Sequence, residues 1–319
     1  MNTQAASPAQ AAAIPMHARE GHIWMDGEFV PWRDARVHVL THSLHYGMGA
    51  FEGIRAYQTE KGAAIFRLTE HVTRLFESAH ILQMEIPRTE REMEEVIVES
   101  VRRNQLTNAY IRPLAFYGAE GMGLRADNLR VHMIVAAWDW GKYIDAEKQR
   151  LGLRVKTSSY TRHHVNVSMC KAKCSGHYVN SMLALHEVTR EGYDEALLLD
   201  VDGFVAEGTG ENVFILRHGT LFTPELTSCL DGITRRTIIQ LAQDKGLRVV
   251  EKRLTRDEVY VAEEAFFTGT AAEIAAISSV DGRRIGTGER GLVTAELSDA
   301  YFALVEGRNP DYHHWLRWC

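Results

Sequence analysis

The chain has 319 residues, of which 45% are apolar and 24% are charged, and its formal net charge is −6. This length favours two domains over one, and the composition is ordinary for a soluble globular protein. A nucleic-acid-binding protein would usually be basic with a clustered patch, so we expect no nucleic-acid partner. No apolar run reaches the length that crosses a membrane, so we expect no membrane association either.

Residues 1–20 predict a disordered leader, because they are rich in Ala, Gln, Ser and Pro. They lack a basic segment followed by an apolar one, so we do not expect a secretory signal. The four cysteines do not make a disulfide framework in a chain this long. Cys170 and Cys174 without a second Cys/His pair are a weak match to a metal site. We therefore expect a cytoplasmic protein with free thiols and no metal, although Cys174 could be sensitive to oxidation.

Residues 21–136 predict a small α+β domain. The Asp26-Gly27 turn separates two apolar runs, 22–25 and 28–32, which is a hairpin signal. Apolar residues spaced three and four apart predict a helix over 68–82. The other elements expected in this half are strands over 53–57, 64–67, 110–117 and 131–138 and a second amphipathic helix over 90–104.

Residues 137–148 are typical of an interdomain connector, and residues 149–319 predict a larger domain. Short strands in hairpins alternate there with helices, which favours mixed sheets with barrel-like packing over a doubly wound parallel sheet. Helices are expected over 178–190 and 234–245, because glycines follow both segments. The strands expected in this half are 153–158, 195–200, 203–205, 212–216, 220–222, 247–252 and 265–268.

Lys173 is the residue that indicates the chemistry most strongly. The small residues that follow it, Ser175 and Gly176, leave room for a flat ring, and Tyr178 can reach a phenolic oxygen on that ring. A lone lysine is most often a solvated surface residue. In this company it favours an enzyme that uses pyridoxal phosphate (PLP), in which a lysine amine binds the cofactor aldehyde covalently.

Glu207 supplies a second requirement of PLP chemistry. It stands in the segment Ala206-Glu207-Gly208-Thr209-Gly210-Glu211-Asn212, whose glycines allow backbone to pass close to a cofactor. A carboxylate against the pyridine nitrogen keeps that nitrogen protonated, so that the ring can accept electrons. The alternative is an ordinary loop carboxylate, since the segment is too short to be a nucleotide-binding fingerprint.

Two segments and one arginine are candidates for a phosphate site. Residues 231–234, Asp-Gly-Ile-Thr, begin a predicted helix, and a helix N-terminus binds anions. Thr234 could instead be only an N-cap residue. Residues 269–273, Gly-Thr-Ala-Ala-Glu, offer a second run of small residues with a hydroxyl. Arg74 could supply the cation, although taken alone it is more often a surface charge.

In chain order these segments resemble the fold-type IV PLP enzymes, the class IV aminotransferases, and among them the bacterial branched-chain amino acid aminotransferases. The resemblance extends over residues 22–314 and implies an α+β fold with an active site between two domains. It rests on seven motifs, Leu44-His45-Tyr46-Gly47, Phe51-Glu52-Gly53-Ile54-Arg55, Tyr110-Ile111-Arg112-Pro113, residues 173–178, residues 207–212, residues 231–234 and residues 269–273.

The resemblance implies pyridoxal 5'-phosphate as the cofactor and Lys173 as the catalytic residue that links to it. It implies that Tyr178 contacts the phenolic oxygen of the ring and that Glu207 contacts the ring nitrogen. Leu230 matches a residue packed against the ring. The other implied cofactor-binding residues are Arg74, Gly210, Asn212, Gly232, Ile233, Thr234, Gly269 and Thr270.

The resemblance also implies a substrate site with two parts. Tyr110 and the Thr270-Ala271 backbone match the α-carboxylate site, and Arg112 matches the residue that accepts the distal carboxylate of glutamate. The implied apolar pocket consists of Tyr46, Phe51, Gly53, Met122, Leu124 and Trp140. In the family Tyr46, Met122 and Leu124 reach into the neighbouring subunit, which implies a homodimer or a trimer of dimers.

The implied reaction is a ping-pong transfer of the amino group of L-leucine, L-isoleucine or L-valine to 2-oxoglutarate, giving a branched 2-oxo acid and L-glutamate. The alternatives on the same scaffold are a D-amino acid transaminase, an (R)-amine transaminase and an aminodeoxychorismate lyase, which differ in the small-domain pocket. A PLP-binding protein without activity would lack the base or the electron-sink partner. Lys173 and Glu207 are both present.

Overall fold

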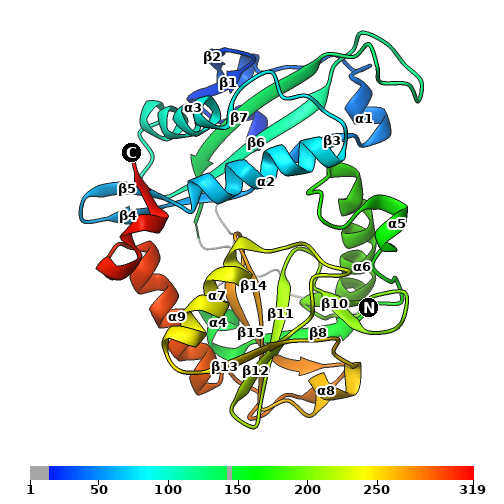
Figure 1. Cartoon of the computed structure of the whole chain (residues 1–319), viewed down its shortest axis with the longest axis vertical. Coiled ribbons are helices and arrows are strands. Elements are labelled where there is room, and N and C mark those ends of the chain that lie inside the picture. Colours follow the sequence, from blue (N-terminus) through cyan, green and yellow to red (C-terminus); the bar gives the residue numbers. More distant parts are fainter. Residues whose placement is uncertain (1–13, 142–145) are drawn as a thin grey trace, which may run out of the picture.

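In the computed structural model, which describes residues 14–141 and 146–319, the strands fall into two sheets. The first sheet and its helices occupy the upper part of Figure 1 and the second sheet occupies the lower part. Of the predicted leader, residues 1–13 lie outside the described residues, and Met16–Ala18 form a short 3-10 helix, η1. Residues 142–145 of the predicted connector also lie outside, and α4 (Ala146–Leu151) follows them.

The first sheet has the strand order β17-β5-β4-β6-β7-β1-β2, with β3 paired to β6. The Asp26-Gly27 turn joins β1 to β2, which confirms the predicted hairpin. Between described residues, every strand pairing in this sheet is antiparallel. The strands are β1 (His22–Met25), β2 (Glu28–Pro31), β3 (Gly49–Phe51), β4 (Ile54–Thr59), β5 (Gly62–Phe66), β6 (Ala109–Tyr117), β7 (Val131–Asp139) and β17 (Leu316–Trp318).

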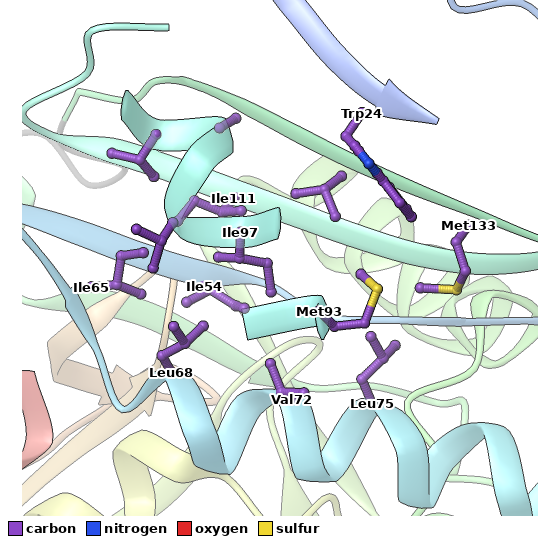
Figure 2. Packing of buried hydrophobic residues seen from close by; sticks show 14 of the residues in the cluster. Trp24, Ile54, Ile65, Leu68, Val72, Leu75, Met93, Ile97, Ile111 and Met133 are labelled. Atoms are coloured by element: carbon purple, nitrogen blue, oxygen red, sulfur yellow. The ribbon is translucent and has the colours of Figure 1, made fainter. Parts of the chain in front are cut away.

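Two amphipathic helices, α2 (Leu68–Ile81) and α3 (Glu90–Arg103), pack against the first sheet. Figure 2 shows Leu68, Val72 and Leu75 rising from α2 toward the strands. Each side chain is buried, and burial of such a side chain contributes roughly 1.5–3 kcal/mol relative to exposure. The apolar spacing in the sequence therefore predicted both helices correctly, because it marks the face that this core covers.

The second sheet is mixed and has the order β10-β9-β8-β15-β14-β11-β12-β13, with β16 paired to β15. Its two outer segments meet where the Val205 N–H donates to the Leu254 carbonyl at 2.8 Å, so the sheet curls toward closure as the expected barrel-like packing requires. The strands are β8 (Leu153–Thr157), β9 (Glu195–Leu199), β10 (Val205–Glu207), β11 (Asn212–Arg217), β12 (Thr220–Thr223), β13 (Arg248–Glu251), β14 (Glu264–Gly269), β15 (Glu273–Val280) and β16 (Arg283–Arg284).

Three longer helices surround this sheet, namely α6 (Tyr178–Arg190), α7 (Ile233–Asp244) and α9 (Leu292–Val305). In the part of the chain that the structure describes, none of the helices has the length and apolar character that a bilayer span needs. The shorter helical segments are α1 (His42–Tyr46), α5 (Val165–Ser168), α8 (Arg256–Tyr260), η2 (Trp32–Asp34), η3 (Ser175–His177) and η4 (Pro310–Trp315).

The predicted α+β architecture with mixed sheets is confirmed, and the sequence missed several elements. It did not predict α9, whose apolar residues surround most of the helix and so give little periodic signal. It did not predict β15 or β17 either. Strand β17 pairs with β5, Leu316 opposite Phe66, so the last residues return to the first sheet although the sequence placed them in the second domain. Such a long-range pairing leaves no mark in the local sequence pattern.

Candidate active site

The backbone of Lys173 is hydrogen-bonded on one side to helix α2 and on the other side to strand β3 of the first sheet. Its N–H donates to Ser78 Oγ on α2 at 3.0 Å, and its carbonyl accepts from the Phe51 N–H at 3.1 Å. Its Nζ donates to the Tyr178 hydroxyl at 2.7 Å and lies 5.1 Å from the centre of the Phe51 ring. The amine is thus fixed between two aromatic rings from different halves of the chain.

One cavity beside this amine brings together every residue that the sequence predicted for cofactor binding. The lining comes from both halves of the chain, and Arg162, Glu211 and Thr268 also contribute to it. The predicted members found there are Arg74, Lys173, Tyr178, Glu207, Gly210, Asn212, Leu230, Gly232, Ile233, Thr234, Gly269 and Thr270.

Glu207 ends β10 with both carboxylate oxygens engaged. Oε1 accepts from Arg162 Nε at 2.7 Å, and Oε2 accepts from the Leu230 N–H at 3.2 Å. The guanidinium of Arg162 is held in turn by Asn180, whose Oδ1 accepts from Nη1 at 3.2 Å. Sequence reasoning missed Arg162, because it lies in a loop distant from Glu207 along the chain. A carboxylate held in this position can face a positively charged ring nitrogen.

Arg74 is held on α2 by a carboxylate that comes from the β3–β4 junction. Glu52 accepts from Arg74 Nε at 2.7 Å and from Nη2 at 2.9 Å, and the Asp231 carbonyl accepts from Nη1 at 2.8 Å. Burial alone would raise the pKa of Glu52. The charge of Arg74 and the hydrogen bonds from His71 and Arg74 outweigh burial and hold that pKa well below its usual range.

The start of α7 faces the same cavity. Gly232 precedes the helix without a side-chain cap, so the first N–H groups of the helix have no partner within it. A side chain at this position is excluded, because a Cβ there would lie 1.9 Å from Asn212 Oδ1. Asn212 is fixed by its own bond to the Leu230 carbonyl at 2.9 Å. The helix N-terminus and Arg74 therefore form a cradle suited to an anion.

A second part of the cavity is walled by aromatic residues and contains Arg112. Arg112 Nη2 donates to the Tyr110 hydroxyl at 3.1 Å, and the guanidinium lies 4.6 Å from the centre of the Phe51 ring. Gly53 makes room for that hydroxyl, since a Cβ there would lie 2.1 Å from it. The predicted substrate residues that line this part are Phe51, Gly53, Tyr110, Arg112, Trp140, Thr270 and Ala271.

Comparison with known proteins identifies the family of this site. A family model described as Amino-transferase class IV matches residues 49–280. The chain belongs to the class IV aminotransferases. This class IV aminotransferase is 59% identical over 302 residues to the branched-chain-amino-acid aminotransferase of Pseudomonas aeruginosa, and the match covers 95% of this chain and 98% of that protein.

Solved structures of other class IV aminotransferases share its fold. The branched-chain amino acid aminotransferase of Escherichia coli superposes with a TM-score of 0.91 at 44% identity, covering 93% of this chain and 99% of that one. The branched-chain amino acid aminotransferase of Thermobaculum terrenum, solved in its PLP form, gives a TM-score of 0.88 at 35% identity, covering 93% and 98%. The expected fold-type IV architecture and PLP cofactor are thereby confirmed.

The residues of this class IV aminotransferase fit PLP. Lys173 offers an amine, Glu207 a carboxylate, and the cradle of Arg74 and α7 offers donors for a phosphate. Thr268 is 1% exposed and lines the cavity, and its buried hydroxyl has no hydrogen-bond partner among the described residues, so this hydroxyl is a further donor for a bound group. Within residues 14–141 and 146–319, no group of three or more His, Cys, Asp or Glu side chains could hold a metal ion.

The remaining predicted substrate residues of the aminotransferase lie elsewhere. Tyr46 is 40% exposed at the end of α1, and Met122 and Leu124 are 49% and 89% exposed between β6 and β7. They do not line the cavity beside Lys173 of their own chain. Within this chain, therefore, the apolar pocket contains only part of its predicted wall.

Two further carboxylates meet near the glycine loop of the aminotransferase, and sequence reasoning did not single them out. Glu211 Oε2 accepts from the Gly210 N–H at 3.0 Å, and Glu195 Oε1 accepts from the Ala196 N–H at 2.7 Å. Burial and the neighbouring charge of Glu195 raise the pKa of Glu211 to about 8. Glu211 lines both parts of the cavity, so its protonation state bears on the charge of the cavity wall.

Proposed function

We infer that the chain is a PLP-dependent branched-chain amino acid aminotransferase. It transfers the amino group of L-leucine, L-isoleucine or L-valine to 2-oxoglutarate and yields a branched 2-oxo acid and L-glutamate. The observation that carries this inference is the continuous site in which the Lys173 amine, the Glu207 carboxylate, an anion cradle and an aromatic pocket meet. The family and its members that are similar to this chain support the same activity.

The cofactor-binding residues have complementary roles in this proposal. Bound PLP supplies an electron sink for the bonds at the amino acid α-carbon. Glu207, held by Arg162, stabilises positive charge at the ring nitrogen, and Tyr178 donates toward the phenolic oxygen. Arg74 and the first N–H groups of α7 hold the phosphate.

Lys173 is proposed to move the substrate proton. Its Nζ is hydrogen-bonded to the Tyr178 hydroxyl at 2.7 Å, which orients the amine toward the common wall of the two cavity parts. An amine in that position can take the proton from the α-carbon of the amino acid in the first half-reaction. In the second half-reaction it can give a proton back to the α-carbon of the oxo acid. The bonds from its backbone to Ser78 and Phe51 hold it in place during this transfer.

The pocket must accept an aliphatic side chain in one half of the reaction and a carboxylate in the other. Phe51, Tyr110 and Trp140 offer apolar surface for the first. Arg112 offers a cation for the second, and its Nε has no hydrogen-bond partner among the described residues. An unpaired carboxylate in such a pocket would cost several kcal/mol, so one arginine at the wall is what allows both substrates.

We also propose the assembly, the domain division and the location of the enzyme. Tyr46, Met122 and Leu124 are apolar and exposed, which is suited to completing the pocket of a second subunit in a homodimer or a trimer of dimers. The proposed domains are residues 21–136 and 149–319 with a connector at 137–148. The cysteines are all free, and free buried thiols are usual in the cytoplasm.

A substrate panel with purified enzyme tests the proposed activity. We expect glutamate formation from 2-oxoglutarate with leucine, isoleucine and valine, and little conversion of D-alanine or (R)-amines. Preferred conversion of D-alanine would contradict the proposal and would assign the chain to a sister activity on the same scaffold. Binding of PLP without any spectral change upon addition of leucine would indicate a protein without transaminase activity.

A further inference from the structure

Glu52, His71 and Arg74 form a buried polar cluster to which the proposed function gives only one direct role, that of Arg74. Their exposed fractions are 0% for Glu52, 1% for His71 and 6% for Arg74. Glu52 Oε2 accepts from Nη2 of Arg74 at 2.9 Å and lies 2.7 Å from His71 Nδ1, and Oε1 accepts from Nε of Arg74 at 2.7 Å. A carboxylate at this depth is rare unless it is paired, so its partners define its position.

The bonds to Glu52 determine which edge of the Arg74 guanidinium faces the cavity. A guanidinium has five N–H donors in one plane. Two of them bind Glu52 and a third binds the Asp231 carbonyl next to the start of α7. The other two remain for a ligand, and the rigid contact on one edge fixes the direction in which they point.

The chain on either side of Glu52 lines the substrate part of the site. Phe51 and Gly53 both contribute to the pocket around Tyr110, whereas the Glu52 side chain turns the other way toward α2. The Glu52 N–H donates to the Pro113 carbonyl on β6 at 3.0 Å, which fixes this junction to the sheet. One residue therefore joins the anion cradle to the wall of the substrate pocket.

We propose that Glu52 is a positioning residue for cofactor binding, which holds the Arg74 guanidinium so that its free N–H groups face the PLP phosphate. This inference rests on the proposed PLP site. It concerns a residue that does not itself contact the cofactor and acts through Arg74. Arg74 without this contact would lose its fixed orientation while remaining in the cavity.

Two opposite effects of Glu52 on phosphate binding must be weighed. Its negative charge repels a phosphate, so removing the carboxylate could strengthen binding. That charge is already neutralised at short range by the bidentate contact with Arg74, so a phosphate meets a pair with little net charge. Loss of a preset geometry then dominates, since an arginine that must be ordered on binding gives up part of its interaction energy.

The test compares binding of PLP and of pyridoxal, which lacks the phosphate, to the apoenzyme of the wild type and of E52Q. We expect E52Q to bind PLP about tenfold more weakly, because a charge-assisted bidentate contact is lost. Its affinity for pyridoxal should change by less than about twofold, since pyridoxal does not use Arg74. The matched control is E95Q, which removes a surface carboxylate paired with Arg317 and should change neither affinity.

Equal weakening of PLP and pyridoxal binding by E52Q would overturn the proposal, because it would indicate general damage to the site. Tighter PLP binding would overturn it as well, since repulsion would then outweigh positioning. If E52Q does not fold, as judged by the thermal midpoint of the apoenzyme, E52D provides the same comparison. It keeps the charge but is too short to hold both nitrogens, and we expect a loss restricted to PLP.

A double variant tests whether Glu52 acts through Arg74. In an R74K background the cation cannot make the two-nitrogen contact, so adding E52Q should not weaken PLP binding further. An additional loss in the double variant would contradict the proposed route. The wild type distinguishes a failure of the proposed phosphate cradle from a failure of the proposed role of Glu52. Equal wild-type affinity for PLP and pyridoxal would refute the phosphate cradle itself. A wild-type preference for PLP that E52Q retains would refute only the role of Glu52.

Discussion

The cofactor half of the cavity, around Arg74, Glu207 and the start of α7, is built differently from the substrate half, around Tyr110, Arg112 and Trp140. Two buried ion pairs, Arg74 with Glu52 and Arg162 with Glu207, fix the cofactor half. Aromatic walls form the substrate half, and three of its predicted residues lie exposed on the surface instead. The comparison teaches that contacts within this chain fix the cofactor half, whereas part of the predicted wall of the substrate half does not line the cavity of this chain.

Replacing Lys173 should have the largest effect, and that effect should be on the chemistry of the cofactor half and not on the stability of the fold. We expect K173A to lower the transamination rate by roughly 10⁴-fold or more, since it removes both the covalent partner of PLP and the base. Single-turnover absorbance with leucine measures this loss. The thermal midpoint of the apoenzyme should stay close to that of the wild type, because the Lys173 side chain makes one hydrogen bond among the described residues. A variant that retained a tenth of the activity would contradict the role of Lys173.

Arg162 tests whether ion pairing holds the cofactor half in place. We expect R162Q to lower kcat by about 10²-fold, because Glu207 loses the hydrogen bond from Arg162 Nε that holds its carboxylate in place against the ring nitrogen. KM for leucine should change much less, since Arg162 does not line the substrate half. The matched control is R154Q, which removes a largely exposed arginine paired with Asp194. A change in KM with unchanged kcat would assign Arg162 to substrate binding instead.

The sequence predicted the cofactor half more completely than the substrate half. Lys173, Tyr178 and Glu207 lie within short segments whose residue types carry the chemistry, and the structure brings them to one cavity. The sequence did not predict that Arg162 pairs with Glu207 or that Glu52 pairs with Arg74. The fold determines which charges are buried together, and a partner can come from any part of the chain. The spacing within the chain gave no sign of either pair.

The missed elements of the fold have a similar explanation. Strand β17 is short and depends on its pairing with β5, and α9 has little contrast between its faces. Helices α2 and α6 were predicted because each has an apolar stripe or a clear glycine stop. Local sequence patterns thus predicted the helices that have one apolar face or a glycine stop. They failed for elements whose formation depends on contacts with distant segments of the chain.

Arg112 sharpens the description of the substrate half. We expect R112A to weaken the half-reaction with glutamate by about tenfold more than the half-reaction with leucine, since only glutamate has a distal carboxylate. Single-turnover measurements of the two half-reactions give this ratio directly. Equal losses in both would show that Arg112 supports the pocket wall through Tyr110 and Phe51 rather than binding the carboxylate.

Glu211 should produce the smallest effect, on stability as a function of pH. Its pKa is raised from 4.5 to about 8 in the folded chain, so the folded state binds more protons than the unfolded state between those values. Stability linked to this group is therefore full below pH 4.5 and is lost as pH rises toward about 8. In urea unfolding of the apoenzyme, the free energy of unfolding should therefore decrease between pH 4.5 and about 8, and E211Q should make that decrease smaller by at least about 1 kcal/mol. An identical pH dependence of the free energy of unfolding in the wild type and in E211Q would contradict this role of Glu211.

The covalent link between Lys173 and PLP is the claim on which the whole account depends. Borohydride reduction of the enzyme incubated with PLP, followed by peptide mass spectrometry, locates that link directly. We predict a single phosphopyridoxyl group on the peptide that contains Lys173, and none in K173A. A label on another lysine, or an enzyme that stays colourless and unlabelled after incubation with PLP, would contradict the account.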